Sequence, residues 1–472
     1  MGSWARLWIG LGLIAAAAAC AGRNLPPEPD SYVAADAIGA ARAAELAASP
    51  AAMWLDDMQS AEMSALAREA LAGSPNLQIA EARARAARWR ARGALGGLLP
   101  DLAIGADATR TETPAGAGVR NTAEIMTSRV SASWEIDLWG RLSARALASD
   151  LTADAARADL DGARLSVAGQ TARGWVDLIE AQQLLALARE DLATRERALD
   201  LTQRRYEAGI VSSLALRTAR SQVASARGFQ SQAGEAMLGA SRRLQEVMGR
   251  YPDGVLAAAG GLPALAPLAA AGAPADLLQR RPDVLASERR MRAAGFRMHE
   301  ARAAMLPRLT LTGSAGSRGE GLDDIDDSVN MISNLVGGLT MPIFQGGALL
   351  SEQRASAADR QAAAADYVRT AIAAWREVEG AISADESLHV REREFSIAAE
   401  EARAAQDLAE REYSRGVATL FELIDAYTRR IDAERGLIAA RAQRVSNRIG
   451  YHVALGGGAR TGGVDENRDA AP

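Results

Sequence analysis

Two stretches decide the fold: Leu99-Pro100-Asp101-Leu102 and Leu306-Pro307-Arg308-Leu309. They mark the same point in two copies of one repeated structural unit. Two further pairs of segments hold the same offset of 207 residues: Ser74-Pro75-Asn76-Leu77 with Arg281-Pro282-Asp283-Val284, and Tyr206-Glu207-Ala208-Gly209-Ile210 with Tyr413-Ser414-Arg415-Gly416-Val417. Three proline or glycine landmarks at one offset indicate an internal tandem repeat.

Each copy has the same order of predicted elements. A helix of about 24 residues begins at the first proline and stops before Leu-Pro, since proline disfavours helix in the residue before it. Two strands follow, in which apolar and polar residues alternate with period two. The apolar positions are Leu102, Ile104, Ala106, Ala108, Val130, Ala132, Trp134 and Ile136 in the first copy and Leu309, Leu311, Gly313, Ala315 and, less regularly, Met331, Leu335, Leu339, Met341 and Ile343 in the second.

A long helix follows in each copy, from about Arg141 to Tyr206 and from about Leu349 to Tyr413. At a rise of about 1.5 Å per residue, each reaches on the order of 100 Å. Within the first helix, leucines recur every seven residues with alanines between them: Leu178, Ala181, Leu185, Ala188, Leu192 and Leu199. This spacing predicts a coiled-coil seam in which small residues let helices approach closely. A shorter return helix is expected from about Leu214 to Met248 and from Leu420 to Ala454.

The four predicted strands cannot close a membrane barrel alone, because such barrels need about eight or more. They would also leave open sheet edges and an uncovered apolar face. We favour a barrel completed by several chains and continued by helices, with one set of polar side chains lining a wet lumen: Thr109, Arg129, Ser131, Glu135, Thr310 and Thr312. The alternative is a soluble α+β sheet packed on helices.

The N-terminus predicts export. After Arg6, an apolar run from Leu7 to Ala19 is too short to span a membrane and is typical of a signal peptide, residues 1–19. The run ends at Cys20, in a stretch that resembles a bacterial lipobox, although Ala17 stands where lipoproteins most often carry leucine. We favour lipidation, because Cys20 is the only cysteine and an unpaired thiol in an oxidising compartment needs a reason. An ordinary secretory signal with an incidental cysteine is the alternative.

Charge and catalytic motifs exclude several classes of protein. The net charge of −5 is spread along the chain, so no nucleic-acid partner is expected. The three histidines, His299, His389 and His452, are scattered without a second ligand at metal-binding spacing, and no phosphate loop is present. We therefore predict no enzyme, no metal and no cofactor.

Several motifs together resemble the TolC-like outer-membrane factors, over about Trp54 to Gly458. They are Pro274-Ala275-Asp276-Leu277-Leu278-Gln279-Arg280-Arg281-Pro282-Asp283-Val284, Trp134-Glu135-Ile136-Asp137-Leu138-Trp139-Gly140-Arg141, Pro342-Ile343-Phe344-Gln345-Gly346-Gly347, Tyr413 to Ala426 and Ala454-Leu455-Gly456-Gly457-Gly458. With Cys20, the chain is most similar to the lipoprotein branch that serves resistance-nodulation-division (RND) pumps.

The resemblance implies a mainly α protein with a membrane β-barrel. A homotrimer of four strands per protomer would form a twelve-stranded barrel in the outer-membrane lipid and a periplasmic helical tunnel. The implied partners are a periplasmic adaptor (membrane fusion protein) and an inner-membrane RND transporter, which supplies the energy for passive export of drugs or other small molecules. The expected organisation is signal peptide 1–19, lipidated tether 20–53, first repeat 54–253, connector 254–274, second repeat 275–458 and disordered tail 459–472.

The family also suggests two sites on the helical hairpins. The turns at Gly209-Ile210 and Gly416-Val417 are the expected adaptor-docking tips. Phe421 and Asp425, four residues apart on one helix face, are the expected periplasmic gate. Thr428 stands where the family motif often carries an arginine. The alternative for Asp425 is a solvated helix residue beside Arg429.

Three aromatic residues, Trp134, Trp139 and Phe344, lie near the strand-to-helix passages. They are expected either to anchor at the lipid headgroups or to pack at the junction of barrel and tunnel. Two other functions remain open on the sequence alone. One is the exit duct of a type I protein secretion system, and the other is a periplasmic coiled-coil adaptor or spacer.

Overall fold

The computed structural model describes residues 54–55, 57–114, 120–268, 279–320 and 331–457. The described residues form two compact units: residues 85–155 and 288–366 make the first, and residues 54–84, 156–287 and 367–457 make the second. The predicted signal peptide (1–19), the tether (20–53) with Cys20, and the tail (459–472) lie outside the described residues.

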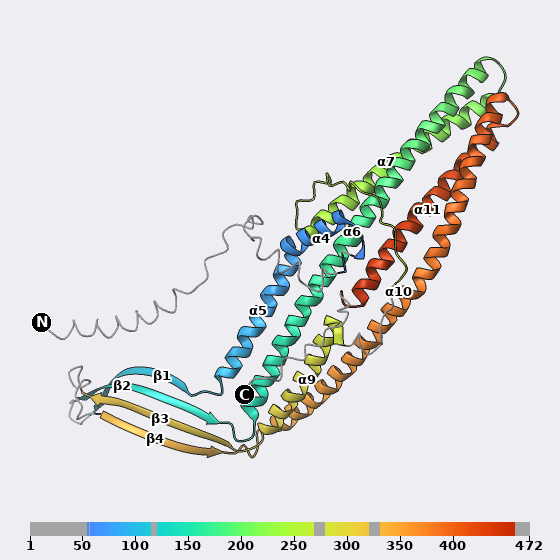
Figure 1. The fold of residues 1–472 in the computed structure, drawn as a ribbon. Coiled ribbons are helices and arrows are strands. Elements are labelled where there is room, and N and C mark those ends of the chain that lie inside the picture. The colour runs from blue at the N-terminus through green and yellow to red at the C-terminus, as the bar shows by residue number, and fades with distance from the viewer. Residues whose placement is uncertain (1–53, 56, 115–119, 269–278, 321–330, 458–472) are drawn as a thin grey trace. The chain divides into compact units, whose positions relative to one another are not determined.

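The helices follow the predicted order (Figure 1). They are α4 (Ala61–Gly73), α5 (Pro75–Gly96), α6 (Arg141–Glu207), α7 (Ser213–Met248), α9 (Pro282–Ala303), α10 (Ala348–Arg415) and α11 (Leu420–Ala454). Both short first helices begin at the predicted prolines, where the missing N–H costs nothing. The long helices α6 and α10 begin and end within two residues of the predicted positions. Among the described residues, no helix combines the length and the apolar character needed to cross a membrane.

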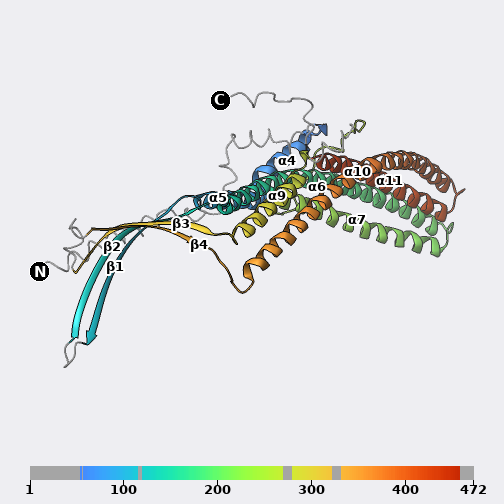
Figure 2. The ribbon, with the colours of Figure 1, turned by 90° about the horizontal axis from the view of Figure 1, so that it is seen from below.

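The first unit contains an antiparallel sheet in the order β1-β2-β3-β4. The strands are β1 (Asp101–Pro114), β2 (Arg120–Ile136), β3 (Arg308–Gly319) and β4 (Met331–Thr340), and Figure 2 shows β1 and β2 side by side along their length. The β2–β3 ladder joins the two sequence repeats within one sheet. The expectation that β4 extends to Met341 and Ile343 is wrong, because Pro342 has no N–H for a ladder.

The register gathers the predicted apolar positions on one face of this sheet. Ile104 pairs with Val130, which pairs on its other side with Ala315, and Leu309 pairs with Leu339. Directly paired residues share a face, so the alternating positions of all four strands align. This face is uncovered: Ile104 is 86% exposed and Leu335 is 75% exposed. This exposure argues against the alternative of a soluble sheet packed on helices.

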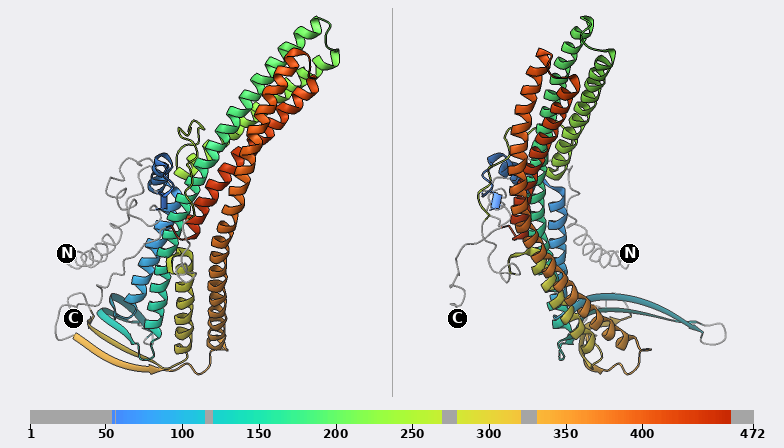
Figure 3. Two further views of the ribbon diagram at one scale, coloured as in Figure 1. Left: turned by 45° about the vertical axis from the view of Figure 1, so that its right-hand side comes forward. Right: turned by 90° about the vertical axis from the view of Figure 1, so that its right-hand side faces the viewer.

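The second unit holds a core formed by α4, α6, α7 and α11. Leu178 of the predicted seam is fully buried there, close to Trp175 of the same helix and Ile449 of α11. Leu192 and Leu199 are only half-buried. The ends of the α6–α7 and α10–α11 hairpins lie at the same end of this unit (Figure 3). That arrangement brings the two predicted tips together.

Candidate functional site

The passage from β2 into α6 is fixed by the polar side chains of the Trp134–Arg141 motif. The Asp137 carboxylate accepts hydrogen bonds from the backbone N–H groups of Leu142 (2.9 Å) and Ser143 (2.8 Å), and from the Ser143 hydroxyl (2.5 Å). It therefore satisfies donors that the first turn of a helix leaves unpaired. Burial raises the pKa of the Asp137 carboxyl, but these hydrogen bonds outweigh burial and leave its pKa below the ordinary value.

Three other residues of this motif close the passage. The Arg141 guanidinium donates two hydrogen bonds to the Glu135 carboxylate, at 3.0 and 2.7 Å. The Trp134 indole donates to the carbonyl of Leu98 (2.9 Å), and the Trp139 indole donates to the carbonyl of Pro307 (2.7 Å). Both tryptophans therefore bond to backbone groups of the first unit, which favours the predicted junction role over headgroup anchoring.

The passage from β4 into α10 carries none of these side chains. The residues 207 positions after Glu135, Asp137 and Trp139 are Pro342, Phe344 and Gly346. Phe344 is 84% exposed, and Gly346 and Gly347 both have positive φ (61° and 83°). Gly347 is equivalent to Gly140 of the first passage, which also has a positive φ (71°), so the second passage differs by its additional left-handed glycine, Gly346, and by its lack of the side chains above.

The two predicted tips have the same backbone geometry. Gly209 and Gly416 adopt φ of 71° and 83°, which side chains with a Cβ resist. In the first tip, the Ile210 N–H donates to the carbonyl of Arg205 (2.9 Å). In the second, the Val417 N–H donates to the carbonyl of Glu412 (3.0 Å). Each long helix therefore ends in a left-handed glycine that satisfies its last carbonyls.

The return helices begin differently. Before α11, Thr419 and Glu422 form a capping box: the Glu422 N–H donates to the Thr419 hydroxyl, and the Thr419 N–H donates to the Glu422 carboxylate (2.6 Å). Before α7, Ser212 caps the Ala215 N–H, but the methyl group of Ala215 cannot accept the hydrogen bond that would complete a capping box. The second tip thus has two additional hydrogen bonds, from the Thr419 N–H and the Thr419 hydroxyl to the Glu422 carboxylate.

The two tips are joined through Tyr413, which is only 2% exposed. Thr202 donates its hydroxyl proton to the carbonyl of Ala198 (2.7 Å), so the Tyr413 hydroxyl donates to Thr202 (2.9 Å). The guanidinium carbon of Arg205 lies 4.8 Å from the centre of the Tyr413 ring. An apolar cluster that includes Leu423 and Tyr427 surrounds this contact. We call the contact of Tyr413 with Thr202 and Arg205 the intrachain joint.

The predicted gate residues lie on the first turns of α11. Phe421 and Asp425 are exposed, and the Asp425 carboxylate accepts a hydrogen bond from Arg429 (2.7 Å), as the solvated interpretation expects. Thr428 donates its hydroxyl to the carbonyl of Ile424 (2.9 Å). A constriction would need side chains from other copies, so the gate stays a prediction.

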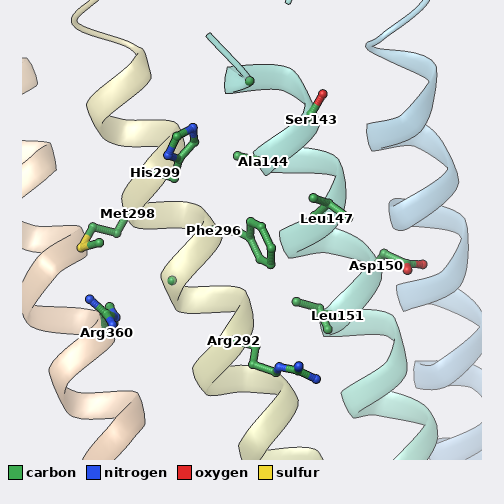
Figure 4. A pocket seen from close by; sticks show the side chains of 12 residues that line it. Ser143, Ala144, Leu147, Asp150, Leu151, Arg292, Phe296, Met298, His299 and Arg360 are labelled. Carbon is green, nitrogen blue, oxygen red and sulfur yellow. The ribbon is translucent and has the colours of Figure 1, made fainter.

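A cavity of about 820 Å³ in the first unit lies between α6, α9 and α10. Figure 4 shows Phe296 of α9 directed towards Leu147 and Leu151 of α6. The polar groups nearby are already engaged: the Ser143 hydroxyl donates to Asp137, and the His299 ring bonds to the carbonyl of Trp139 (3.2 Å). No nucleophile and base are paired in this cavity. Within the part of the chain that the structure describes, no group of three His, Cys, Asp or Glu side chains could hold a metal ion.

Sequence reasoning missed the intrachain joint. Both copies carry a tyrosine three residues before the tip glycine, so Tyr206 and Tyr413 look alike in the sequence. The difference between their surroundings could have been found by comparing Thr202 and Arg205 with the residues 207 positions later.

The comparisons with known proteins agree with this architecture. A family model described as outer membrane efflux protein matches residues 66–250 and 273–457, two segments at the same offset of 207 residues. The chain is 30% identical over 446 residues to the outer membrane protein OprJ of Pseudomonas aeruginosa, covering 92% of this chain and 91% of OprJ. It is 29% identical over 428 residues to the pyoverdine export outer membrane protein OpmQ of Pseudomonas putida, covering 88% and 90%.

Two solved structures share the fold. The outer-membrane channel OprN superposes with a TM-score of 0.80 and 26% identity, covering 86% of this chain and 92% of OprN. The outer membrane protein VceC of Vibrio cholerae superposes with a TM-score of 0.79 and 25% identity, covering 86% and 99%.

Proposed function

This chain belongs to the outer membrane efflux protein family, and we propose that it works as a homotrimeric, passive duct for small molecules. The predicted family, the TolC-like fold with its internal repeat and the outer-membrane efflux function are confirmed. Relatives named for pyoverdine export and toluene efflux favour a small-molecule duct over the exit duct of a type I secretion system. The two hairpins and four strands argue against the periplasmic spacer. The number of copies, the partners and the cargo are parts of the proposal.

The sheet of the first unit carries the proposal. Its apolar face is exposed, and among the described residues β1 and β4 each pair along one edge only. Unpaired edges and an apolar face are costly in water, but both are satisfied when copies close into a barrel in lipid. Three copies supply twelve strands, above the minimum of about eight. The face that carries Arg129, Glu135 and Thr310 then lines the lumen.

The hairpins of the second unit are proposed to form the periplasmic end of the duct. The exposed Ile210 and Val417 follow the tip glycines and offer apolar contacts to a periplasmic adaptor, which in turn engages an inner-membrane RND transporter. Relatives named for pyoverdine export and for toluene efflux support a small-molecule cargo. A conduit needs no catalytic group, since the transporter supplies the energy.

Phe421 and Asp425 are proposed to narrow the mouth of the duct. Three carboxylates around one axis attract cations and repel one another. In each chain Arg429 offsets part of this charge through its hydrogen bond to Asp425. The gate therefore combines an apolar ring with a partly neutralised acidic ring.

Single-channel conductance in planar bilayers tests this function. The purified protein is expected to insert and give small, cation-preferring steps, which become larger and less selective in Asp425→Ala. Asp407→Ala removes an exposed acid of α10 and serves as the matched control. A folded sample that never inserts contradicts the duct. Equal conductance of the two variants keeps the duct and removes the proposed gate.

Lipidation of Cys20 is a separate part of the proposal. Acylation would anchor the chain to the outer membrane independently of the sheet. Mass spectrometry of the N-terminal peptide is expected to show a diacylglyceryl-modified and N-acylated cysteine. An unmodified thiol, or cleavage before another residue, supports the ordinary secretory signal instead.

A further inference from the structure

The helix α9 has two faces that line different cavities of the first unit. The cavity of about 820 Å³ is lined from α9 by Arg292, Gly295, Phe296, Met298 and His299, and from α6 by residues that include Leu147 and Leu151. A second cavity, of about 610 Å³, is lined from α9 by Arg290, Ala294, Arg297, Glu300, Ala301 and Ala304, and from α6 and α10 by residues that include Arg141, Glu352 and Asp359. With about 3.6 residues per turn, the two sets lie on opposite faces of α9. We call the two cavities the apolar groove and the charged groove.

The charged groove continues the polar face of the sheet. Glu135 lies on that face, and its carboxylate accepts both hydrogen bonds of the Arg141 guanidinium, which lines the charged groove. In the proposed duct this face of the sheet lines the lumen, so the charged groove opens towards the lumen as well. The apolar groove lies on the opposite face of α9, on the side of the apolar face of the sheet. In the proposed duct that side is turned towards lipid.

The lining of the apolar groove changes from apolar to basic with increasing distance from the sheet. The helix α9 runs towards β3, so Phe296 lies about one turn nearer to the sheet than Arg292. Arg360 lies more than three turns into α10. Figure 4 shows His299 at one end of the groove and Arg292 at the other, with Phe296 and Leu147 between them. Leu147 is 47% exposed and Phe296 is 36% exposed, so this apolar surface is open to a ligand.

The two arginines of the apolar groove are available to an anion. Arg360 has no hydrogen bond or ion pair with any residue that the structure describes. Arg292 has one long ion pair, with Glu288 at 3.8 Å. Asp150 also lines the groove, but Figure 4 shows its side chain directed away from Phe296. Guanidinium groups bind phosphate oxygens through paired N–H donors, so this end of the groove suits a phosphate.

We propose that the apolar groove binds an anionic phospholipid of the periplasmic leaflet of the outer membrane. Arg292 and Arg360 hold its phosphate, and one acyl chain lies along Leu147, Leu151 and Phe296. The order of the lining matches a lipid in that leaflet, whose chains point towards the membrane and whose phosphate points away from it. The volume of the groove is in the range of ligand sites, about 300–1,000 Å³. The proposal rests on the proposed duct, because the duct turns this side of α9 towards lipid.

A fluorescent label on α6 tests where the lipid lies. Leu151 lines the apolar groove and its neighbour Thr152 lines the charged groove, so the two positions lie at almost the same distance from the sheet. Leu151→Cys and Thr152→Cys are labelled with nitrobenzoxadiazole and inserted into phosphatidylcholine vesicles. The vesicles contain equal fractions of nitroxide-labelled phosphatidylglycerol or nitroxide-labelled phosphatidylcholine. We expect the label at Leu151 to be quenched more by phosphatidylglycerol, and the label at Thr152 to be quenched weakly and equally by both lipids. Cys20 is the only native cysteine, so the unsubstituted protein gives the background.

The arginines are tested in the labelled Leu151→Cys protein. Arg292→Gln/Arg360→Gln is expected to abolish the preference for phosphatidylglycerol, because the phosphate loses both guanidinium groups. Arg302→Gln/Arg354→Gln removes two exposed arginines of α9 and α10 outside the lining of the groove, and is expected to keep the preference. A preference that persists in the first variant, or that is lost equally in both, overturns the proposal.

The remaining outcomes separate the lipid site from the duct. If the labelled protein conducts but phosphatidylglycerol quenches Leu151 no more than Thr152, the lipid site is wrong and the duct stands. In that case the groove is covered by protein, such as residues 20–53 of this chain. If the unsubstituted protein is folded but neither inserts nor conducts, the duct itself is wrong.

Discussion

The two copies of the duplicated unit differ in where their side chains form hydrogen bonds. In the first copy, Asp137 and Arg141 fix the passage from strand to helix, and the tip has a single serine cap. In the second copy, the passage lacks these side chains and has one more left-handed glycine, Gly346, and the tip has a capping box and the buried Tyr413. Both copies nevertheless build the same sequence of elements.

This difference shows which features of the repeat the fold requires and which are free to diverge. The prolines that begin the helices and the glycines that reverse the hairpins are present in both copies, because backbone geometry demands them. The hydroxyl cap of the return helix is also present in both copies, at Ser212 and Thr419. The other side-chain hydrogen bonds described above are present in one copy only. A duplicated chain can therefore keep its architecture while its two halves diverge at the passage from strand to helix and at the hairpin tip.

The largest expected effects on stability are at buried positions that the two copies share. Leu216 and Leu423 are equivalent by the offset of 207 residues, and both are buried. Leu216→Ala and Leu423→Ala should each lower the free energy of local opening of their tip by about 2–5 kcal/mol, through lost burial and a residual cavity. Hydrogen exchange of the tip amides measures this. A large effect in one tip and none in the other breaks the equivalence on which the comparison depends.

The next effect concerns the passages. Asp137→Ala should lower the opening free energy of the first turn of α6 by about 1–2 kcal/mol, because the backbone donors of Leu142 and Ser143 lose their acceptor. Phe344→Ala, at the equivalent position, should leave the first turn of α10 unchanged, since Phe344 is exposed and caps nothing among the described residues. Amide exchange of the two turns compares them directly. Similar losses in both variants would show that Asp137 does not act as a cap.

A smaller effect separates the two tyrosines. Tyr413→Phe removes the hydrogen bond to Thr202 and should cost about 1 kcal/mol of tip stability. Tyr206→Phe should cost nothing measurable, because Tyr206 is 42% exposed and its hydroxyl has no hydrogen bond among the described residues. Exchange rates of the tip amides measure both. A cost for Tyr206→Phe equal to that of Tyr413→Phe would contradict the difference between the two tyrosines.

The smallest effect is a pH dependence of the return helices. The backbone N–H and the hydroxyl of Thr419 donate to the Glu422 carboxylate and hold its pKa below the ordinary value of 4.5. A lowered native pKa means that the unfolded chain binds the proton first, so this stabilisation is present above pH 4.5 and is lost as the pH falls through the native pKa. The first turn of α11 should lose exchange protection over that range, beyond any loss in α7, where Ala215 has no carboxyl. Glu422→Gln should abolish the difference, and a difference that persists in this variant would assign it to other groups.

Much of the fold could be predicted from the sequence because it depends on local chemistry. Pro75, Pro282, Gly209 and Gly416 set helix starts and turns, and alternation set the faces of the sheet. The intrachain joint could not be predicted in this way. The hydrogen bond between Tyr413 and Thr202 links residues 211 positions apart, and the equivalent tyrosine, Tyr206, has no such partner among the described residues. Asp137 was also missed as a cap, because it acts on N–H groups five and six residues later.

The gate and the adaptor-docking tips remain predictions for a physical reason. The structure holds a single copy, and a constriction or a docking groove depends on side chains that other copies contribute. In the single chain Asp425 bonds Arg429, and Ile210 and Val417 are exposed, which is compatible with both roles. The backbone of the tips was predictable, because each long helix ends at a glycine, Gly209 or Gly416, in the left-handed conformation that glycine adopts readily.

One measurement tests most directly the claim that this chain forms a passive duct with an acidic constriction at its mouth. Single-channel conductance is recorded in planar bilayers for the purified protein, for Asp425→Ala and for the control Asp407→Ala. We predict that the unsubstituted protein inserts and gives small, cation-preferring steps, that Asp425→Ala enlarges them, and that Asp407→Ala leaves them unchanged. A folded sample that never inserts would contradict the account.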